Sequence, residues 1–146
     1  MNYARLALAA VVATVVDACY GFTVYGMLLA GEFGKYPSVY RAADAGQAYL
    51  PLMFGGLLVA IVVVTTMYAK GYEGGSGAAE GLRFGLMLGV FVFFAFGGVN
   101  YAVLNIGGRL AMYAAIAGLI EWTLVGLVIG LVYKPSQTSA RKVAGV

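Results

Sequence analysis

Four long apolar stretches, separated by short polar connections, occupy almost the whole of the chain. Each is long enough to cross the hydrocarbon core of a bilayer as a helix of about 20 residues, and none alternates with the period of two expected for a barrel strand. Backbone polar groups cannot stay unpaired in hydrocarbon, and helices satisfy them internally. The pattern therefore predicts an all-α, polytopic membrane protein whose four transmembrane helices form a compact bundle. The expected spans are residues 6–30, 49–69, 82–104 and 110–133.

The spans divide the chain into one membrane domain and a short tail. Residues 1–135 are expected to form the transmembrane domain, and residues 136–146 a polar, basic, cytoplasmic tail. Arg5 and the apolar run after it resemble a signal peptide, and the segment before Cys19 loosely resembles a lipoprotein cleavage box. Asp17 is an unusual residue in such a box, however, and apolar character continues to Ala30. We therefore expect the first span to remain uncleaved.

Composition narrows the chemistry that the chain can carry. Apolar residues make up 62% of the chain and charged residues 10%, whereas soluble domains carry about 25% charged residues. With no histidine and a single cysteine, Cys19, the chain has no ordinary axial ligand for haem, no imidazole for a metal and no internal disulfide. The basic residues are scattered, so the net charge of +3 does not indicate nucleic-acid binding. We expect no cofactor, no metal ion and no nucleic-acid partner.

The distribution of basic residues predicts the orientation in the membrane. With four spans, both termini share one side with the second connection, and this side carries six basic residues against three on the other. Cytoplasmic segments are enriched in Lys and Arg, so both termini are expected in the cytoplasm. The six are Arg5, Lys70, Arg83, Lys134, Arg141 and Lys142, and the three are Lys35, Arg41 and Arg109.

Glycine recurs at every fourth position where the third span begins. We call Gly77, Gly81, Gly85 and Gly89 the glycine stripe. On a helix this spacing leaves one face almost without side chains. In lipid such a face allows a second helix to approach closely, and helices then associate through van der Waals contact. The stripe therefore predicts a close helix contact of the glycine-zipper type.

Three other residues extend this prediction. Asn100 lies about three helical turns beyond Gly89 and is expected to return to roughly the same face, where its side chain could hydrogen-bond across a helix contact. Gly126 and Gly130 form a second pair of small residues on the fourth span. Two interpretations stay open: these faces pack the four helices of one chain together, or the stripe docks another subunit.

Two acidic residues are expected near the middle of the membrane. Asp17 lies about 18 Å along its helix from Arg5, and Glu121 about 20 Å from Lys134, so the two carboxyl groups should share a depth. A charged carboxylate at that depth costs at least ~2.5 kcal/mol, so each group must be protonated, paired or turned toward a polar cavity. The candidate roles are a neutral acid that holds helices in register, a proton-linked transport site, and a contact with a quinone or lipid headgroup. No nucleophile, metal ligand or oxyanion donor accompanies them, so we do not expect an enzyme.

The first connection, residues 31–48, is the longest on its side of the membrane. It carries Phe33, Tyr36, Pro37 and Tyr40, and Tyr49 follows it. Aromatic side chains are typical of the membrane–water interface, so an aromatic belt is one interpretation. A surface that docks a partner is the other.

Several segments of the chain resemble a group of small bacterial inner-membrane proteins with four predicted helices, a family catalogued as a domain of unknown function. The resemblance covers most of the chain and implies a bacterial inner-membrane location, but it implies no activity for any residue. The segments are Gly31-Glu32-Phe33, Tyr36-Pro37-Ser38-Val39-Tyr40, Ala79-Glu80-Gly81-Leu82-Arg83-Phe84-Gly85, Asn100-Tyr101, Asn105-Ile106-Gly107 and Glu121-Trp122.

Two hypotheses of function follow from the sequence. The first is a non-catalytic subunit that packs through its glycine-rich faces into a larger inner-membrane complex, with an energy-converting complex as one candidate. The second is a small homo-oligomeric, proton-coupled transporter that uses Asp17 or Glu121. Both predict the lipid bilayer as surroundings and either other membrane subunits or further copies of the chain as partners.

Overall fold

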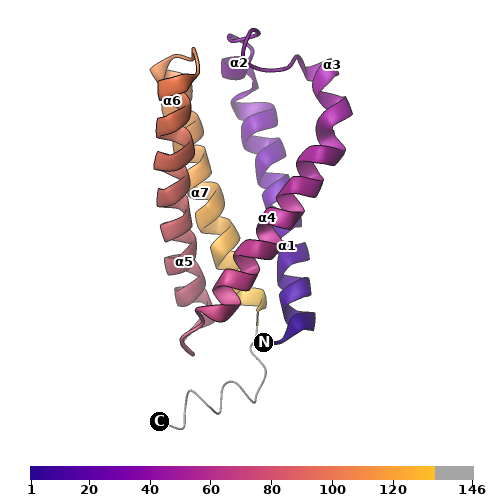
Figure 1. Cartoon of the computed structure of the whole chain (residues 1–146), viewed down its shortest axis with the longest axis vertical. Coiled ribbons are helices and arrows are strands. Elements are labelled where there is room, and N and C mark those ends of the chain that lie inside the picture. The colour runs from indigo at the N-terminus through magenta and orange to yellow at the C-terminus, as the bar shows by residue number, and fades with distance from the viewer. Residues whose placement is uncertain (134–146) are drawn as a thin grey trace.

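The computed structural model describes residues 1–133, so the predicted tail of residues 136–146 lies outside the described part. In chain order the elements are α1 (Tyr3–Thr23), the π-helix η1 (Val24–Leu28), α2 (Ala30–Phe33), α3 (Ala43–Gly46), the 3₁₀-helix η2 (Gln47–Tyr49), α4 (Leu50–Lys70), α5 (Gly77–Val92), the π-helix η3 (Phe93–Gly98), α6 (Val99–Val103) and α7 (Gly108–Val132). Every element of the described residues is helical, and the long helices form one bundle (Figure 1). The all-α prediction is confirmed.

Four continuous helical segments are long and apolar enough to cross a membrane, so the chain is a membrane protein. They begin two to five residues earlier than the predicted spans. The predicted spans began at the first apolar residues, whereas the first turn of a helix can also contain polar residues such as Asp44. The start of α1 and the end of α7 lie at one end of the bundle, and α2, α3 and α6 lie at the other (Figure 1). The segments are Tyr3–Leu28, Asp44–Lys70, Gly77–Val103 and Gly108–Val132.

The glycine stripe of α5 lies directly against α7. A Cβ atom placed on Gly81 would lie 2.6 Å from the carbonyl oxygen of Gly126, and one on Gly85 would lie 2.5 Å from that of Thr123. Cβ atoms do not approach backbone so closely, so only glycine allows this contact. The two backbones therefore touch, and dispersion contacts gain from the close approach. The remaining contacts of the stripe join Gly77 to Gly130 and Gly89 to Leu119.

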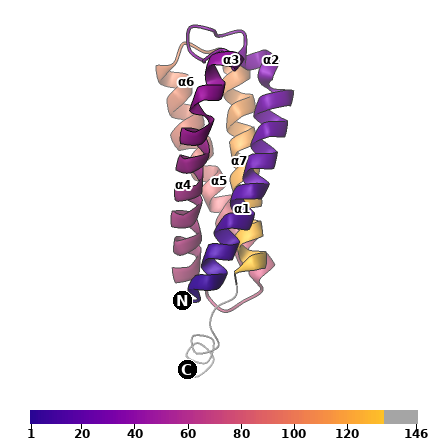
Figure 2. The ribbon, with the colours of Figure 1, turned by 90° about the vertical axis from the view of Figure 1, so that its right-hand side faces the viewer.

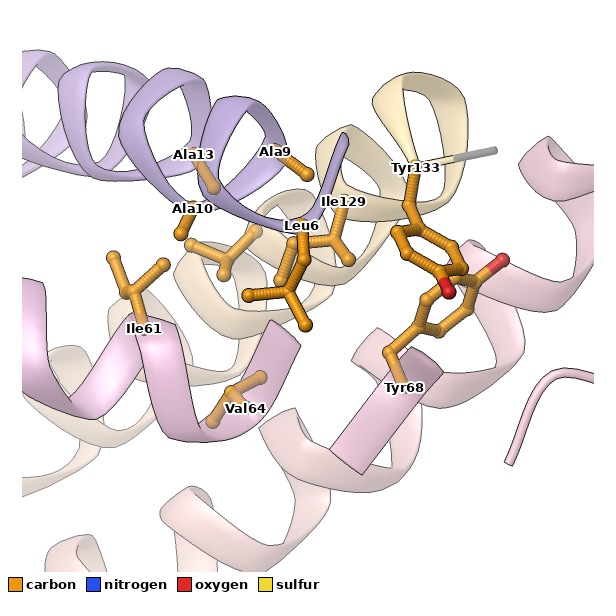
Figure 3. Close-up of a cluster of buried hydrophobic side chains, with 10 residues drawn as sticks. Leu6, Ala9, Ala10, Ala13, Ile61, Val64, Tyr68, Ile129 and Tyr133 are labelled. Atoms are coloured by element: carbon orange, nitrogen blue, oxygen red, sulfur yellow. The ribbon is translucent and has the colours of Figure 1, made fainter. Parts of the chain in front are cut away.

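The buried core lies where the N-terminal half of α1 meets the C-terminal halves of α4 and α7 (Figure 3). Small residues of α1 leave room for Ile61 of α4 and Ile129 of α7, both fully buried. The rings of Tyr68 and Tyr133 meet edge to face with centroids 6.0 Å apart and close this end of the core. The residues of α1 in the core are Leu6, Ala9, Ala10 and Ala13.

Helix α4 crosses α1 at an angle instead of running beside it. The two helices are in contact through the core cluster, and they diverge toward the end that carries α2 and α3 (Figures 1 and 2). The bundle is therefore tight at one end, and the other halves of α1 and α4 are separated.

The connections at both ends are held by specific polar contacts. At the N-terminal end the Glu80 carboxylate accepts hydrogen bonds from the backbone N–H groups of Glu73 and Gly75, which fixes the turn between α4 and α5. At the other end the hydroxyl of Tyr36 accepts a hydrogen bond of 3.0 Å from the Gly107 N–H. This second contact ties the first connection to the start of α7.

Candidate functional site

A cleft of about 1430 Å³ occupies the space between the diverging halves of α1 and α4. The wall formed by α4 is apolar and includes Met53, Phe54 and Leu57. The opposite wall is formed by α1, η1 and the first connection, and includes Phe22. Concave sites of this kind, mostly apolar with a few polar groups, are typical of small-molecule binding. The cleft is therefore the candidate site.

Asp17 lies where the cleft begins because of its position on α1. The buried face of α1 runs through Ala10 and Ala13 to Asp17, which follow one another at helical spacing. The first two residues lie in the core cluster, but α4 has diverged from α1 beyond that cluster. Asp17 therefore keeps the inward direction of this face, is only 3% exposed, and lines the cleft.

Glu121 reaches the same place from α7. The hydroxyl of Tyr25 donates a hydrogen bond of 2.9 Å to its Oε2 atom, and the hydroxyl of Tyr20 donates one of 2.9 Å to the carbonyl oxygen of Ala117, one turn away. Gly21 lies beside this carboxyl group, since a Cβ atom there would be in ordinary van der Waals contact with Oε1, at 3.9 Å. Two tyrosines of α1 and η1 thus hold α7 at the level of the acid.

Asp17 of α1 and Glu121 of α7 both line the cleft where it adjoins the core cluster, and we call these two carboxyl groups the acid pair. Among residues 1–133, no ion pair involves either of them. The Oδ1 atom of Asp17 is buried and has no hydrogen-bond partner in the part of the chain that the structure describes. Two charged carboxylates that line the same end of a mostly apolar cleft repel each other and lose part of their hydration. The acid pair therefore favours an added proton or an added positive charge.

The rim of the cleft lies in the first connection, where the chain leaves the membrane span. Arg41 lines the cleft there, and its guanidinium lies 3.8 Å from the ring centroid of Tyr49. Phe33 and Tyr40 also line the cleft, with ring centroids 4.8 Å apart. The aromatic residues of this connection thus form part of the wall and rim of the cleft.

The other site residues predicted from the sequence lie elsewhere. The glycine stripe, Gly126 and Gly130 lie between α5 and α7, where all of them are buried except the half-buried Gly77. Asn100, expected on the same face, is instead exposed on α6. The reason is the π-helix η3 between the stripe and Asn100, because its wider turns rotate later residues away from the face expected for a regular α-helix.

Tyr20 and Tyr25 were not predicted from the sequence as residues of the site. Their spacing of five places them on different faces of a regular α-helix, whereas the π-helix that begins at Val24 widens the turn beside them. Their rings meet edge to face with centroids 6.4 Å apart.

Comparison of the chain with protein-family models, with curated proteins and with solved structures finds no match.

Proposed function

We propose that this protein is a small proton-coupled carrier that binds its solute in the cleft and exchanges it for a proton on the acid pair. The single observation that supports the proposal is that the cleft leads to the acid pair, where Asp17 Oδ1 is buried without a hydrogen-bond partner among the described residues. An acid that only held helices in register would be expected to complete its hydrogen bonds within the protein. An intramembrane acid that lines a cavity is typical of solute and proton pathways.

The shape of the bundle provides a route for the exchange. The cleft separates α1 from α4 at one end, and the core cluster closes the other end. A carrier must open each end in turn, and the crossing of α1 and α4 is the point about which α4 would rock. The backbone contact between α5 and α7 would stay fixed during this motion, because the glycine stripe leaves no space for sliding side chains.

The second hypothesis remains a non-catalytic subunit of a larger complex, whose partners would be other proteins. The carrier hypothesis instead predicts that copies of this chain associate with one another. Because α7 covers the glycine stripe, either kind of partner would have to bind another surface, such as the exposed aromatic side chains Phe91, Phe94 and Phe96. Purification in a gentle detergent and mass determination of the intact particle distinguishes the two. Foreign subunits at fixed stoichiometry support the accessory role, and a homo-oligomer supports the carrier.

The proposed location is the inner membrane of a bacterium, with both termini in the cytoplasm. Among the described residues, Arg5, Lys70 and Arg83 belong to the end with the N-terminus, and Lys35, Arg41 and Arg109 to the other end. The predicted bias therefore depends on Lys134, Arg141 and Lys142, which lie outside the described residues. A reporter fused after Val146 tests the orientation, since it must be active in the cytoplasm.

Vesicles with a trapped pH dye test the carrier itself. The purified protein is reconstituted into these vesicles. Sets of cationic, anionic and neutral solutes are then added in turn to the outer solution, and the dye records proton movement across the membrane. Glu121→Gln should abolish solute-driven proton movement, because the amide still accepts the hydrogen bond from Tyr25 but cannot exchange a proton. Glu73→Gln, an exposed acid in the turn between α4 and α5, is the matched control and should behave as wild type. Proton movement that persists in Glu121→Gln would remove Glu121 as the coupling residue.

A further inference from the structure

We infer that the solute that binds in the cleft is a hydrophobic organic cation. This inference names the substrate class of the proposed carrier, and the transport of the cation rests on that proposed function. The inference starts from the charge of the acid pair. Of the residues that line the cleft, Asp17 and Glu121 are the only acids, and both lie where the cleft adjoins the core cluster. No basic side chain of residues 1–133 forms an ion pair with them. A cationic group is therefore the chemical complement of this end of the cleft.

The walls match the rest of such a molecule. Between the acid pair and the rim the cleft is lined mainly by apolar and aromatic side chains, among them Phe22, Phe54 and Leu57. These bury hydrocarbon, and an aromatic face stabilises a nearby cation through its quadrupole. Tyr25 is placed to act in this way, since it lines the cleft and its hydroxyl contacts Glu121. A small, strongly hydrated ion would gain nothing from these walls.

The ionisable groups that face the acid pair determine which group can give up the proton. Tyr20 and Tyr25 face it from α1 and η1, Glu121 comes from α7, and the residues of α4 that line the cleft carry no ionisable group. Arg41 is the basic residue of the lining and lies at the rim, stacked over Tyr49. The exchange is therefore a reaction of the acid pair: the cation binds, one O–H bond of a carboxyl group breaks, and the proton leaves to water. Net charge in the site is unchanged.

Two probes with the same hydrocarbon frame test the inference. The first is (2-naphthylmethyl)trimethylammonium, and the second is 2-neopentylnaphthalene, in which a carbon replaces the charged nitrogen. Binding to the full-length protein in phosphatidylethanolamine–phosphatidylglycerol nanodiscs is measured by equilibrium dialysis against empty nanodiscs, with a pH dye in weak buffer. We expect the cation to bind at least ~10-fold more tightly at pH 8 than the neutral probe, a difference of about 1.4 kcal/mol, and to release one proton per site. Its affinity should fall as the pH falls.

Asp17→Asn and Glu121→Gln are the test variants and Glu73→Gln is the control. Either test variant should lose proton release and lower the affinity for the cation to that for the neutral probe, whereas the control should retain both. Equal affinities for the two probes in the wild-type protein would overturn the inference, as would tight cation binding that both test variants preserve. Because no gradient is present, binding is separate from transport. Cation binding with proton release in nanodiscs, but no solute-driven proton movement in vesicles, would keep the inference and refute the proton-coupled carrier. Proton-coupled transport of neutral solutes alone would do the reverse.

Discussion

Tyr25 links two helices through one hydrogen bond at the level of the acid pair. Its hydroxyl donates to Glu121 Oε2, and its ring contacts those of Tyr20 and Phe33. The residue therefore combines a structural role between η1 and α7 with a direct contact to the proposed site of proton exchange. The wider π-helical turn is what brings the hydroxyl to this position, and π-helical turns recur at functional sites.

Tyr25→Phe removes this hydrogen bond and leaves the ring in place. We expect a loss of about 0.5–1.5 kcal/mol in the free energy of unfolding, because Glu121 Oε2 loses its donor in a poorly hydrated site. Thermal unfolding in detergent measures the change. Tyr101→Phe is the control, since this exposed hydroxyl forms no hydrogen bond within residues 1–133. Equal stability of both variants and the wild type would show that the bond contributes nothing.

Glu32 gives a pH dependence that is separate from the acid pair. Its carboxylate accepts a hydrogen bond of 2.7 Å from Lys35 and lies 3.5 Å from Arg109, and these contacts hold its pKa below the ordinary value of 4.5. A carboxyl group whose pKa is lowered by folding stabilises the protein above its unfolded pKa. That contribution should be complete above about pH 4.5 and should disappear as the pH falls through the lowered pKa.

The unfolding midpoints of wild type and Glu32→Gln, compared across pH, test this prediction. The difference between them should be constant above about pH 4.5 and should shrink toward zero in stronger acid. The measurement reports the charged contacts of Glu32, of which the closer is with Lys35 in the same connection and the longer with Arg109 at the start of α7. A difference that does not change with pH would mean that neither contact of the carboxylate stabilises the fold.

At the scale of the elements, the contact between α5 and α7 depends on the absence of side chains. Gly81→Ala places a Cβ atom 2.6 Å from the carbonyl oxygen of Gly126 and 2.9 Å from the Cα atom of Gly130. Backbone atoms cannot move aside as a flexible side chain would, so the helices must separate. We expect a loss of about 1–3 kcal/mol in the free energy of unfolding, the range typical of overpacked cores.

Gly55→Ala on α4 is the matched control for this substitution. A Cβ atom there meets no atom of residues 1–133 within 4 Å, so the variant should be neutral or more stable by up to about 1 kcal/mol, because alanine favours helix over glycine. Both variants are compared by unfolding in the same detergent. Similar stability of Gly81→Ala and Gly55→Ala would contradict the close contact of α5 and α7.

The elements also show how far sequence reasoning extends. The apolar runs predicted four helices and their approximate ends, because length and hydropathy decide what can cross a bilayer. The spacing of the glycine stripe predicted a close contact but not that α7 would fill it, since spacing describes only one of the two surfaces. Asn100 was misplaced because nothing in the local sequence signals the π-helix η3. The angle between α1 and α4, and therefore the cleft, depends on packing between distant residues and has no local signal.

The same limit applies to the candidate site. Hydropathy identified Asp17 and Glu121, because an acid in an apolar span is conspicuous. Their meeting depends on the mutual rotation of α1 and α7, which a pattern along one helix does not contain. Tyr25 could be recognised only once η1 was known, since its hydroxyl reaches Glu121 from a π-helical turn. Contacts between residues far apart in the sequence thus decide which polar residues of the membrane spans come together in a site.

At the scale of the whole molecule, the bundle has a closed end and an open end. The closed end contains the core cluster around Ile61 and Ile129, and the open end contains the cleft, bounded by α4 and by the aromatic residues of the first connection. The acid pair lies between them, at the deep end of the cleft. This arrangement places a site of proton exchange at the boundary where a carrier would have to change its access.

Infrared difference spectroscopy of the full-length protein in nanodiscs tests this account most directly. The carbonyl band of a protonated carboxylic acid is recorded before and after (2-naphthylmethyl)trimethylammonium is added, and the double variant Asp17→Asn, Glu121→Gln identifies which part of the band belongs to the acid pair. We predict that the probe removes part of this band in the wild-type protein and leaves the double variant unchanged. A band that stays constant while the probe is shown to bind, or that changes equally in the double variant, would contradict proton exchange at the acid pair.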